Sequence, residues 1–394
     1  MSVALSPELR LVVACCTWPP SAARAQSVRA AADAGVDWDM VCALVERHRV
    51  RGLVYDGLRS SGAALPEAVE RRLVEGAANT ARHSLFLAGE ALRLQDLLDR
   101  ASVRGVFLKG TALAKLAYGN IGIKQAWDID LLVAPQNLMA SCTVLAAAGY
   151  RRLIPAPDVP DDLFLAWSRH ANEAEFVNDA NHTHVELHWR VSRSETELSH
   201  ITARAPGRDV PVMGQQTLRT LADADHFSYL CVHGAHHGWF RLKWLADLAA
   251  WLNTLPAEAI EDYHRQACAH RVGASTAQSL RLCEVLFGTV LPPALSASLA
   301  ADPKTAELVD FALAEIATVQ APAAGGESLR HKFRSTLYLF ALTPRPLDFA
   351  RSLFSGAFRA DDLAVVKLPP ALFAVYLPLR PFLWLWRRVL RRRV

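Results

Sequence analysis

The chain has 394 residues, of which 52% are hydrophobic and 21% are charged, and its formal net charge is +4. This composition excludes a disordered or low-complexity protein. Six arginines and no acidic residue follow residue 377, so the positive excess lies in the tail and the body is near neutral. Such a distribution argues against a protein that coats long nucleic acid.

The cysteines indicate a compartment. There are seven, scattered along the chain and without a CxxC pair. The sequence therefore disfavours a disulfide framework or a cysteine-rich zinc site, and a reducing cytosol suits this usage. The N-terminal segment carries the early acid Glu8 and lacks the basic start of a signal peptide. We therefore expect a cytoplasmic protein.

Residues 1–102 are predicted to be helical, because apolar residues recur there at three- and four-residue spacing. The pattern changes at residues 103–108, VRGVFL, a short β-branched and aromatic run that predicts a buried strand. Gly110 and Thr111 then begin a predicted helix that ends at Gly119.

Several strands are predicted downstream of this helix. Residues 128–133, DIDLLV, predict a second strand, residues 135–149 a helix, and residues 150–153 a third strand. Residues 173–177, EAEFV, and 184–191, HVELHWRV, predict a hairpin.

The order of these elements predicts an α+β fold with a small mixed sheet. The expected core occupies residues 103–217. It follows the N-terminal helical region at residues 1–102 and precedes a C-terminal helical domain at residues 218–367. Residues 368–394 form an apolar and basic tail.

Two aspartates bracket one isoleucine where the strand at residues 128–133 begins. Because side chains alternate faces along a strand, Asp128 and Asp130 point the same way, beside apolar neighbours. Such carboxylates repel each other, and a divalent cation such as Mg²⁺ relieves that repulsion. Glu186, in an alternating strand, is the candidate third acid of a site for one or two ions. His184 and His188 share its face as supporting groups, a general base or ordinary polar residues.

A phosphate-binding arrangement precedes the acid pair. A strand, the triplet Lys109-Gly110-Thr111 and a helix start follow one another. Glycine lets a phosphate approach the backbone, and a helix N-terminus offers unpaired N–H groups and partial positive charge. Thr111 can donate a hydroxyl, while Lys109 and Lys124 can add charge.

At these residues the chain resembles the nucleotidyltransferase superfamily that includes DNA polymerase β. It is similar, over most of its length, to the bacterial uncharacterised nucleotidyltransferase family. The shared elements, in order, are LKGTAL, YGN, DIDLLV, VELHWRV and HGAHHGWFRLKWLADL. Thr111 replaces the usual glycine or serine of the superfamily. Lys124 lies where arginine is frequent, which keeps the positive charge but not the bidentate geometry of a guanidinium.

The resemblance implies a metal-dependent enzyme that moves a nucleoside monophosphate, such as AMP from ATP, to an acceptor and releases pyrophosphate. It implies that Asp128, Asp130 and Glu186 are catalytic and bind Mg²⁺ or Mn²⁺, with two ions expected. The residues expected to bind the nucleotide are Lys109, Gly110, Thr111, Lys124, His233 and Lys243.

His233, His236 and His237 share one face of a predicted helix. They could bind zinc, although no HExxH glutamate accompanies them, or make hydrogen bonds at a helix end. The resemblance favours a third role, in which His233 and His237 line a cleft between the core and the helical domain, together with Lys243 and Asp247.

The expected partners are an NTP and an acceptor that the sequence does not identify. A small molecule or a peptide or protein side chain is favoured over long nucleic acid, because the body is near neutral. Two alternatives remain open: a toxin-like nucleotidyltransferase that acts on a tRNA end, and a non-catalytic nucleotide-binding module. The second would lack one of the acids, and all three are present.

Residues 368–386 raise the question of a membrane, since a bilayer-spanning helix needs about 20 apolar residues. Four prolines and Arg380 interrupt the segment, which disfavours a spanning helix. It could pack on the protein, or its tryptophans and the basic end at residues 387–394 could contact an anionic lipid surface. Peripheral membrane contact is therefore an alternative to a purely cytoplasmic location.

Overall fold

The structure, a computed structural model, describes residues 4–318 and 328–390, with side chains described up to residue 386. Residues 321–327, APAAGGE, whose composition predicts a loop, lie outside the described residues, and the side chains of the basic end at 387–394 also lie outside the description. The chain divides into two compact units. Unit 1 comprises Met1–Glu90, Lys109–Ala126 and Gly207–Pro344, and unit 2 comprises Ala91–Leu108, Trp127–Pro206 and Arg345–Val394.

Unit 1 is built mostly from helices. Its elements are α1 (Pro7–Cys16), α2 (Ala22–Asp33), α3 (Trp38–His48), α4 (Arg51–Ser61), the larger part of α5 (Glu67–Arg100), α6 (Thr111–Tyr118), β6 (Gly207–Met213), β7 (Gln216–Leu221), α9 (Asp223–His236), α10 (Leu242–Leu252), α11 (Ala257–Ala269), α12 (Gly273–Phe287), α13 (Pro293–Ala301), α14 (Pro303–Ala317) and α15 (Leu329–Leu342). Side-chain caps define several helix starts. The hydroxyl of Ser6, for example, accepts the N–H of Leu9 at 3.2 Å.

A buried polar network joins α9, α12 and α15 within unit 1. The hydroxyl oxygen of Tyr338 lies 2.9 Å from both the carbonyl oxygen of Ala235 and Oε1 of Gln278, so its one proton is shared between two acceptors. Nε1 of Trp239 donates to the same amide oxygen at 3.3 Å. A Cβ at Gly234 would come within 2.2 Å of the Trp239 ring. Only glycine therefore lets this indole lie against α9.

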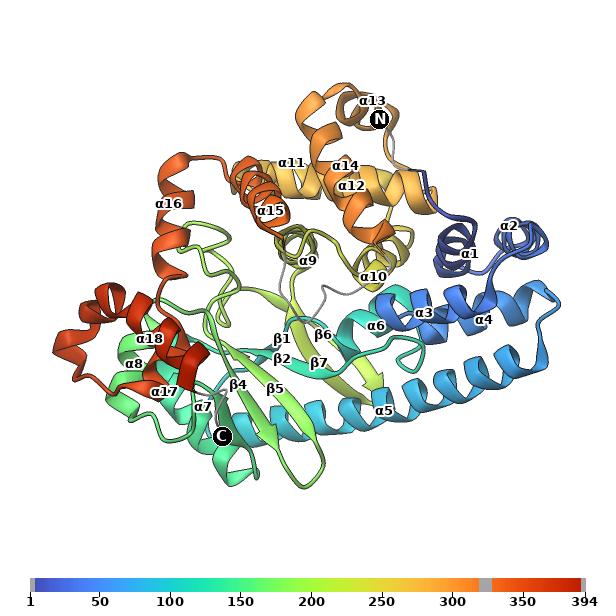
Figure 1. Cartoon of the computed structure of the whole chain (residues 1–394). Helices are drawn as coiled ribbons and strands as arrows, with labels where there is room; N and C mark the ends of the chain where they lie inside the picture. The colour runs from blue at the N-terminus through green and yellow to red at the C-terminus, as the bar shows by residue number, and fades with distance from the viewer. Residues whose placement is uncertain (1–3, 319–327, 391–394) are drawn as a thin grey trace. The chain divides into compact units, whose positions relative to one another are not determined.

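Unit 2 holds a five-stranded mixed sheet in the order β1-β2-β5-β4-β3, in which β2 and β5 are parallel and the other neighbours are antiparallel (Figure 1). Its elements are the end of α5, β1 (Val106–Phe107), β2 (Asp128–Leu132), η1 (Pro135–Asn137), α7 (Leu138–Ala147), β3 (Arg151–Ile154), α8 (Asp161–Ser168), β4 (Glu173–Asn178), β5 (Thr183–His188), α16 (Pro346–Ser355), α17 (Ala360–Val365), η2 (Pro370–Val375) and α18 (Tyr376–Leu390).

The centre of this sheet is buried and its edges are short. Leu131, Leu132 and Leu187, on β2 and β5, are fully buried. The edge strand β1 has two residues. The other edge, β3, carries Arg151 and Arg152 and shifts its register against β4. The strands that carry the acid pair and Glu186 are therefore the interior strands of the sheet, and their apolar side chains are buried.

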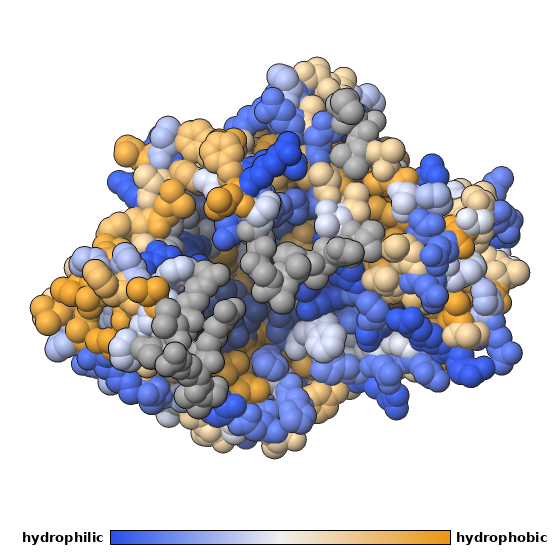
Figure 2. Space-filling view, in the orientation of Figure 1, coloured by the Kyte–Doolittle hydropathy of each residue, from blue (hydrophilic) through white to orange (hydrophobic). Residues whose placement is uncertain are grey.

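The C-terminal helices of unit 2 are partly packed and partly exposed. Phe373 and Tyr376 are buried, whereas Phe382 exposes 70% and Trp386 exposes 59% of its surface. Hydrophobic side chains of this region are visible at the left of Figure 2, where Figure 1 places α18. Part of this segment therefore packs on the protein, as one of the two interpretations expects, and membrane contact by the exposed part stays a prediction.

Among the described residues, no single helix has the length and apolar character needed to cross a bilayer. Two stretches, Pro346–Val365 and Pro370–Trp386, meet that criterion only when taken together, and the chain bends by 113° between them.

The α+β fold class predicted from the sequence is confirmed, with a small mixed sheet flanked by helices in chain order. Most element bounds differ from the prediction by a few residues. One prediction is wrong: residues 218–221, expected to begin the C-terminal helices, complete β7 of a two-stranded hairpin. The segment QTLRTL alternates between polar and apolar residues, which is the pattern of a half-buried strand.

Unit 1 also contains a buried histidine that makes its stability sensitive to acid. Nδ1 of His48 accepts the N–H of Leu242 at 3.1 Å. Burial, followed by the nearby Arg47, lowers the pKa of His48 from 6.5 to about 3. Below pH 6.5 the unfolded chain therefore binds a proton that the folded chain does not. The stabilisation is complete above that pH and is lost as the pH falls toward 3.

We predict that replacing His48 by Gln flattens this dependence. Between pH 6 and pH 4.5 the free energy of unfolding of the wild type should fall by about 1.4 kcal/mol per pH unit more than that of His48→Gln, because one proton fewer is involved. Urea denaturation at several pH values measures both slopes. Parallel slopes for the two proteins would contradict the assignment.

Candidate active site

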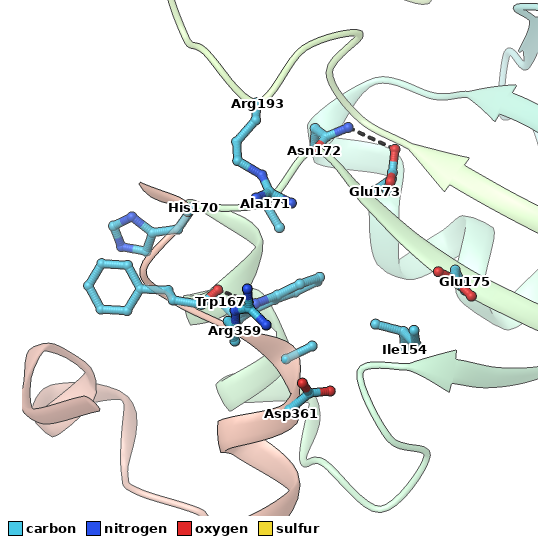
Figure 3. A pocket seen from close by; sticks show the side chains of 13 residues that line it. Ile154, Trp167, His170, Ala171, Asn172, Glu173, Glu175, Arg193, Arg359 and Asp361 are labelled. Atoms are coloured by element: carbon cyan, nitrogen blue, oxygen red, sulfur yellow. Dashed lines mark hydrogen bonds between the residues drawn. The ribbon is translucent and has the colours of Figure 1, made fainter. Parts of the chain in front are cut away.

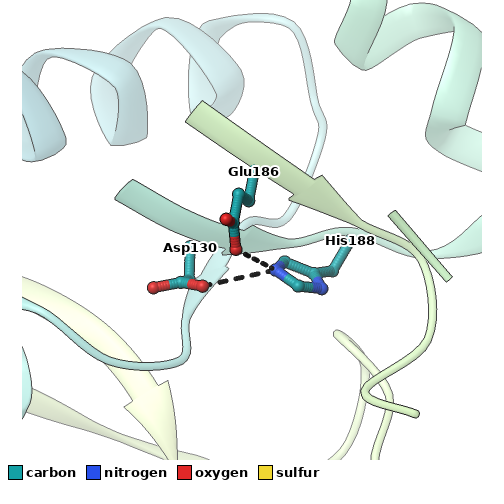
Figure 4. Close-up of side chains that lie close together, drawn as sticks. All are labelled: Asp130, Glu186 and His188. Atoms are coloured by element: carbon teal, nitrogen blue, oxygen red, sulfur yellow. Dashed lines mark ion pairs between the residues drawn. The ribbon is translucent and has the colours of Figure 1, made fainter. Parts of the chain in front are cut away.

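Parallel pairing of β2 with β5 brings acids from distant parts of the chain into one row. Asp130 lies directly opposite Glu186, and Asp128 lies opposite His184. Because alternate residues of a strand share a face, these side chains point to the same side of the sheet. Figure 4 shows Asp130 and Glu186 pointing toward one another and toward His188. The two acids expected on separate strands are therefore neighbours.

His188 lies among three carboxylates. Its Nε2 is 3.4 Å from Oδ1 of Asp130 and 3.6 Å from Oε2 of Glu186, and its Nδ1 is 3.1 Å from Oε2 of Glu173. Burial alone would disfavour a charged imidazole. The three carboxylates, Glu173 foremost, outweigh it and raise the pKa of His188 to about 10. The imidazolium therefore neutralises part of the negative charge in the row.

The same residues form a group of potential metal ligands. One oxygen of Asp130, one oxygen of Glu186 and one nitrogen of His188 lie within 4.8 Å of one another. The Asp130 side chain is only 1% exposed, and a buried carboxylate needs a compensating positive charge. Carboxylates suit Mg²⁺, and a mixed carboxylate and imidazole set suits Mn²⁺, provided that the bound cation displaces the proton of His188, because only a neutral imidazole coordinates a metal. The donor set therefore fits a divalent cation.

Asp128, the remaining predicted ligand, is not a member of this group. It lies two residues before Asp130 on the same face of β2 and is partly buried. Its charge is felt at Glu175 on β4, whose pKa is raised by burial and by the carboxylates of Glu173 and Asp128. Asp128 therefore extends the acidic row, with Glu175 beside it.

The predicted phosphate-binding residues lie in unit 1. Gly110 has φ 65° and ψ −126° and immediately precedes α6, without a side-chain cap. A residue with a Cβ rarely adopts this backbone, so glycine is required here. The uncapped first turn, which starts at Thr111, can receive an anion. Nζ of Lys109 lies 3.4 Å from Nε2 of His233, so these two predicted nucleotide-binding residues are neighbours.

Lys124 has a different environment from the one expected of a phosphate-binding cation. Its ammonium forms a buried ion pair with Oδ2 of Asp247, and the hydroxyl of Tyr118 donates to Oδ1 of the same carboxylate at 2.9 Å. The Lys124 side chain is 7% exposed. Asp247 is therefore a buried acid. It does not form a solvent-exposed ion pair with Lys243, which lies four residues before it on α10.

The histidines of α9 gather around an indole. The ring centroids of His233 and His237 lie 4.7 Å apart, and the ring of His237 stacks on Trp244 at 5.1 Å. His236 is exposed on the same turn. Lys243 precedes Trp244 on α10 and is partly buried. These histidines do not form a metal-ligand group within the part of the chain that the structure describes.

Sequence reasoning left the role of His188 open and overlooked Glu173 and Glu175. All three lie on the face that carries Asp130 and Glu186, because Glu173 is opposite His188 and Glu175 is opposite Glu186. The segment EAEF shows the same alternation of acid and apolar residue as DIDL. That alternation was the signal available to find them.

Neighbouring strands of this α+β core bring carboxylates together, which is a donor set that can hold a divalent cation. The model of the family described as "Uncharacterised nucleotidyltransferase" matches residues 34–288, well over half of the chain. The chain belongs to this family, which confirms the resemblance seen in its motifs and assigns it to the nucleotidyltransferases. No curated protein matches the chain.

We predict that Asp130→Asn weakens Mn²⁺ binding at least about tenfold, equivalent to about 1.4 kcal/mol, because it removes an anionic ligand. Titration followed by the electron paramagnetic resonance signal of free Mn²⁺ measures the affinity. Asp209→Asn is the matched control, since Asp209 is an exposed acid on the β6–β7 hairpin. Equal affinity in the wild type and Asp130→Asn would exclude Asp130 as a ligand.

Proposed function

We propose that this chain transfers a nucleoside monophosphate from an NTP to an acceptor hydroxyl and releases pyrophosphate, in a reaction that depends on Mg²⁺ or Mn²⁺. ATP is the first NTP to test. The observation that carries the proposal is the pairing of Asp130 with Glu186 across two parallel strands, in a chain of the nucleotidyltransferase family.

In this proposal Asp130, Glu186 and Asp128 hold the divalent ions, one or two in number. Bound cations would stabilise the charge that develops on the phosphoryl group and on the leaving pyrophosphate. The carboxylate oxygens of Asp130 and Glu186 lie within 4.8 Å of each other, which supports a shared role as ligands. Asp128 lies on the same strand face, which supports its role as a further ligand. His188, held among the carboxylates, orients the side chains of Asp130 and Glu186.

The transfer step places a definite demand on Glu186. The acceptor oxygen forms a bond to the α-phosphorus, the bond from that phosphorus to the bridging oxygen breaks, and pyrophosphate leaves with the bonding pair. The hydroxyl proton must be accepted, and we assign it to the carboxylate of Glu186. That side chain is 29% exposed, whereas Asp130 is almost fully buried. Glu186 is thus the acid of the pair that an entering acceptor can reach.

Nucleotide binding is proposed for the residues around the start of α6. Gly110 and Thr111 would hold phosphate oxygens through the backbone and a hydroxyl, with Lys109 and His233 supplying charge and hydrogen bonds. The uncapped helix start and the contact between Lys109 and His233 support this assignment. The remaining candidates are Lys124 and Lys243. Lys124 would have to exchange Asp247 for a phosphate.

We predict that incubation with radiolabelled ATP, Mg²⁺ and a cell lysate of the source transfers label to an acceptor, and that Asp130→Ala abolishes the transfer. The reason is that the variant lacks a ligand for the cation that the reaction needs. Separation of the products by size shows whether the label enters a small molecule, a protein or a tRNA.

One result would count against the enzyme, and another would count against its proposed mechanism. A wild type that binds ATP without transferring label would favour the non-catalytic nucleotide-binding module. Transfer that persists in Asp130→Ala would remove the metal-dependent mechanism. Label found in the tRNA fraction alone would favour the toxin-like alternative.

We also propose that α18 makes peripheral contact with an anionic membrane surface. It exposes Phe382, Trp384, Leu385 and Trp386. No acidic residue follows Asp362, whereas Arg380 and five later arginines do. Exposed aromatic residues next to basic ones favour the boundary of a bilayer that contains acidic lipids.

Flotation with vesicles tests this contact. The wild type should float with vesicles that contain phosphatidylserine, and the double substitution Trp384→Glu and Trp386→Glu should stay at the bottom, because it puts carboxylates against an acidic surface. Val290→Glu, at a residue that is 77% exposed in unit 1, is the matched control. Flotation of the double variant at the wild-type level would refute the contact.

A further inference from the structure

A cavity of about 290 Å³ lies in unit 2, lined by residues of β4 and α8, by Arg193 after β5, and by the turn before α17 (Figure 3). Small-molecule sites usually range from about 300 to 1,000 Å³. The space therefore suits a small molecule or the end of a chain, and is too small for a folded partner.

Tightly packed aromatic side chains hold one side of the cavity in place. Nε1 of Trp167 donates to the carbonyl of Phe358 at 3.3 Å. The ring of His170 stacks on Phe358, with centroids 4.2 Å apart, and on Phe373 at 5.5 Å. Trp167, Phe358 and Phe373 are buried. This side of the cavity is therefore preformed, and its apolar surface can receive the carbon skeleton of a ligand.

Charges of opposite sign face the cavity without pairing. Glu175 lines it from β4, and Arg193 and Arg359 line it from other sides (Figure 3). Among the described residues, none of these three side chains makes a hydrogen bond or ion pair. Glu175 is partly buried, so its carboxylate has lost water without gaining a donor. A ligand with a cationic group for Glu175 and an anionic group for Arg193 and Arg359 would pair with the charges on both sides of the cavity.

The cavity adjoins the acidic row. Glu175 is directly opposite Glu186 across β4 and β5, and neighbouring strands lie about 4.8 Å apart. Glu173 lines the cavity and also contacts Nδ1 of His188 at 3.1 Å. The cavity therefore borders the strand that pairs with the strand of Glu186, and a ligand in it lies beside the acidic row.

We infer that this cavity is the acceptor subsite and that it takes a small zwitterion, with an ammonium group at Glu175, a carboxylate at Arg193 and Arg359, and an apolar body against Trp167. The inference rests on the proposed transferase function. A simple anion would be repelled by Glu175, and a polyamine would be repelled by the two arginines. A ligand with both charges is complementary to Glu175 and to the two arginines, while Glu173 and Asp361, the other acids of the lining, already have partners.

Binding of three related probes to the full chain tests the inference. L-Tyrosine carries both charges, a ring and a hydroxyl; N-acetyl-L-tyrosine lacks the ammonium, and L-tyrosinamide lacks the carboxylate. Calorimetric titration should give L-tyrosine at least about a tenfold higher affinity than either analogue, because each analogue leaves one wall unsatisfied. Inorganic phosphate is the fourth probe and should bind more weakly than L-tyrosine.

Variants of the two walls should give a crossed pattern. Glu175→Gln should weaken L-tyrosine and L-tyrosinamide but not N-acetyl-L-tyrosine. Arg359→Ala, and likewise Arg193→Ala, should weaken L-tyrosine and N-acetyl-L-tyrosine but not L-tyrosinamide. A variant that merely disturbs the fold would weaken all three probes alike. Arg169→Ala, at an exposed arginine outside the lining of the cavity, is the matched control.

Failure of this inference is distinguishable from failure of the transferase. L-Tyrosine that binds no better than its analogues, phosphate that binds more tightly than L-tyrosine, or the absence of the crossed pattern overturns the subsite. NTP binding and label transfer are measured separately, without these probes. A wild type that shows the crossed pattern but neither binds nor turns over NTP would keep the zwitterion site and lose the transferase.

Discussion

The register between β2 and β5 is the constraint on which the rest of the site depends. With Asp130 opposite Glu186, every acid of the site falls on one face of the sheet, and the leucines between them fall on the other. A slip of one residue would turn Glu186 into the hydrophobic layer and bring Leu187 out to the acids. The burial of Leu131 and Leu187 therefore fixes the position of the carboxylates, and hydrophobic packing stabilises the chemistry.

Two of the buried carboxylates among the described residues, Asp247 and Asp130, are neutralised in different ways. In unit 1, Asp247 is held by Lys124 and by the hydroxyl of Tyr118, all deeply buried. In unit 2, Asp130 faces His188 together with Glu186, which remains partly open to solvent. A closed lysine pair suits a permanent support inside a unit. An imidazole beside an open carboxylate leaves room for a cation to enter and for a proton to move.

The sequence predicts the parts of the site that depend on the alternation of side chains along a single strand. The segments DIDLLV and HVELHWRV predict which residues share a face within one strand, and so Asp130 and Glu186 could be proposed. Alternation does not reveal which strands pair or in what register, so the contacts of His188 and the place of Glu175 required the sheet order. The burial of Lys124 could not be predicted either, because its partner Asp247 is 123 residues away. Nor did helical periodicity distinguish the β6–β7 hairpin from a helix start.

The short edges of the sheet in unit 2 have a consequence for solubility. An exposed strand edge presents unpaired N–H and C=O groups that can recruit another chain and begin aggregation. Here the edge strand β3 is interrupted by a shift in register, and Arg151 on it is paired with Asp179. The side chain of Arg152 lies over the ring of Phe164 at 4.6 Å, so a charge is retained close to that edge. The shift in register and the charges near β3 therefore disfavour the pairing of a further strand with this edge, while β2 and β5, with the buried Leu131, Val185 and Leu187, lie inside the sheet.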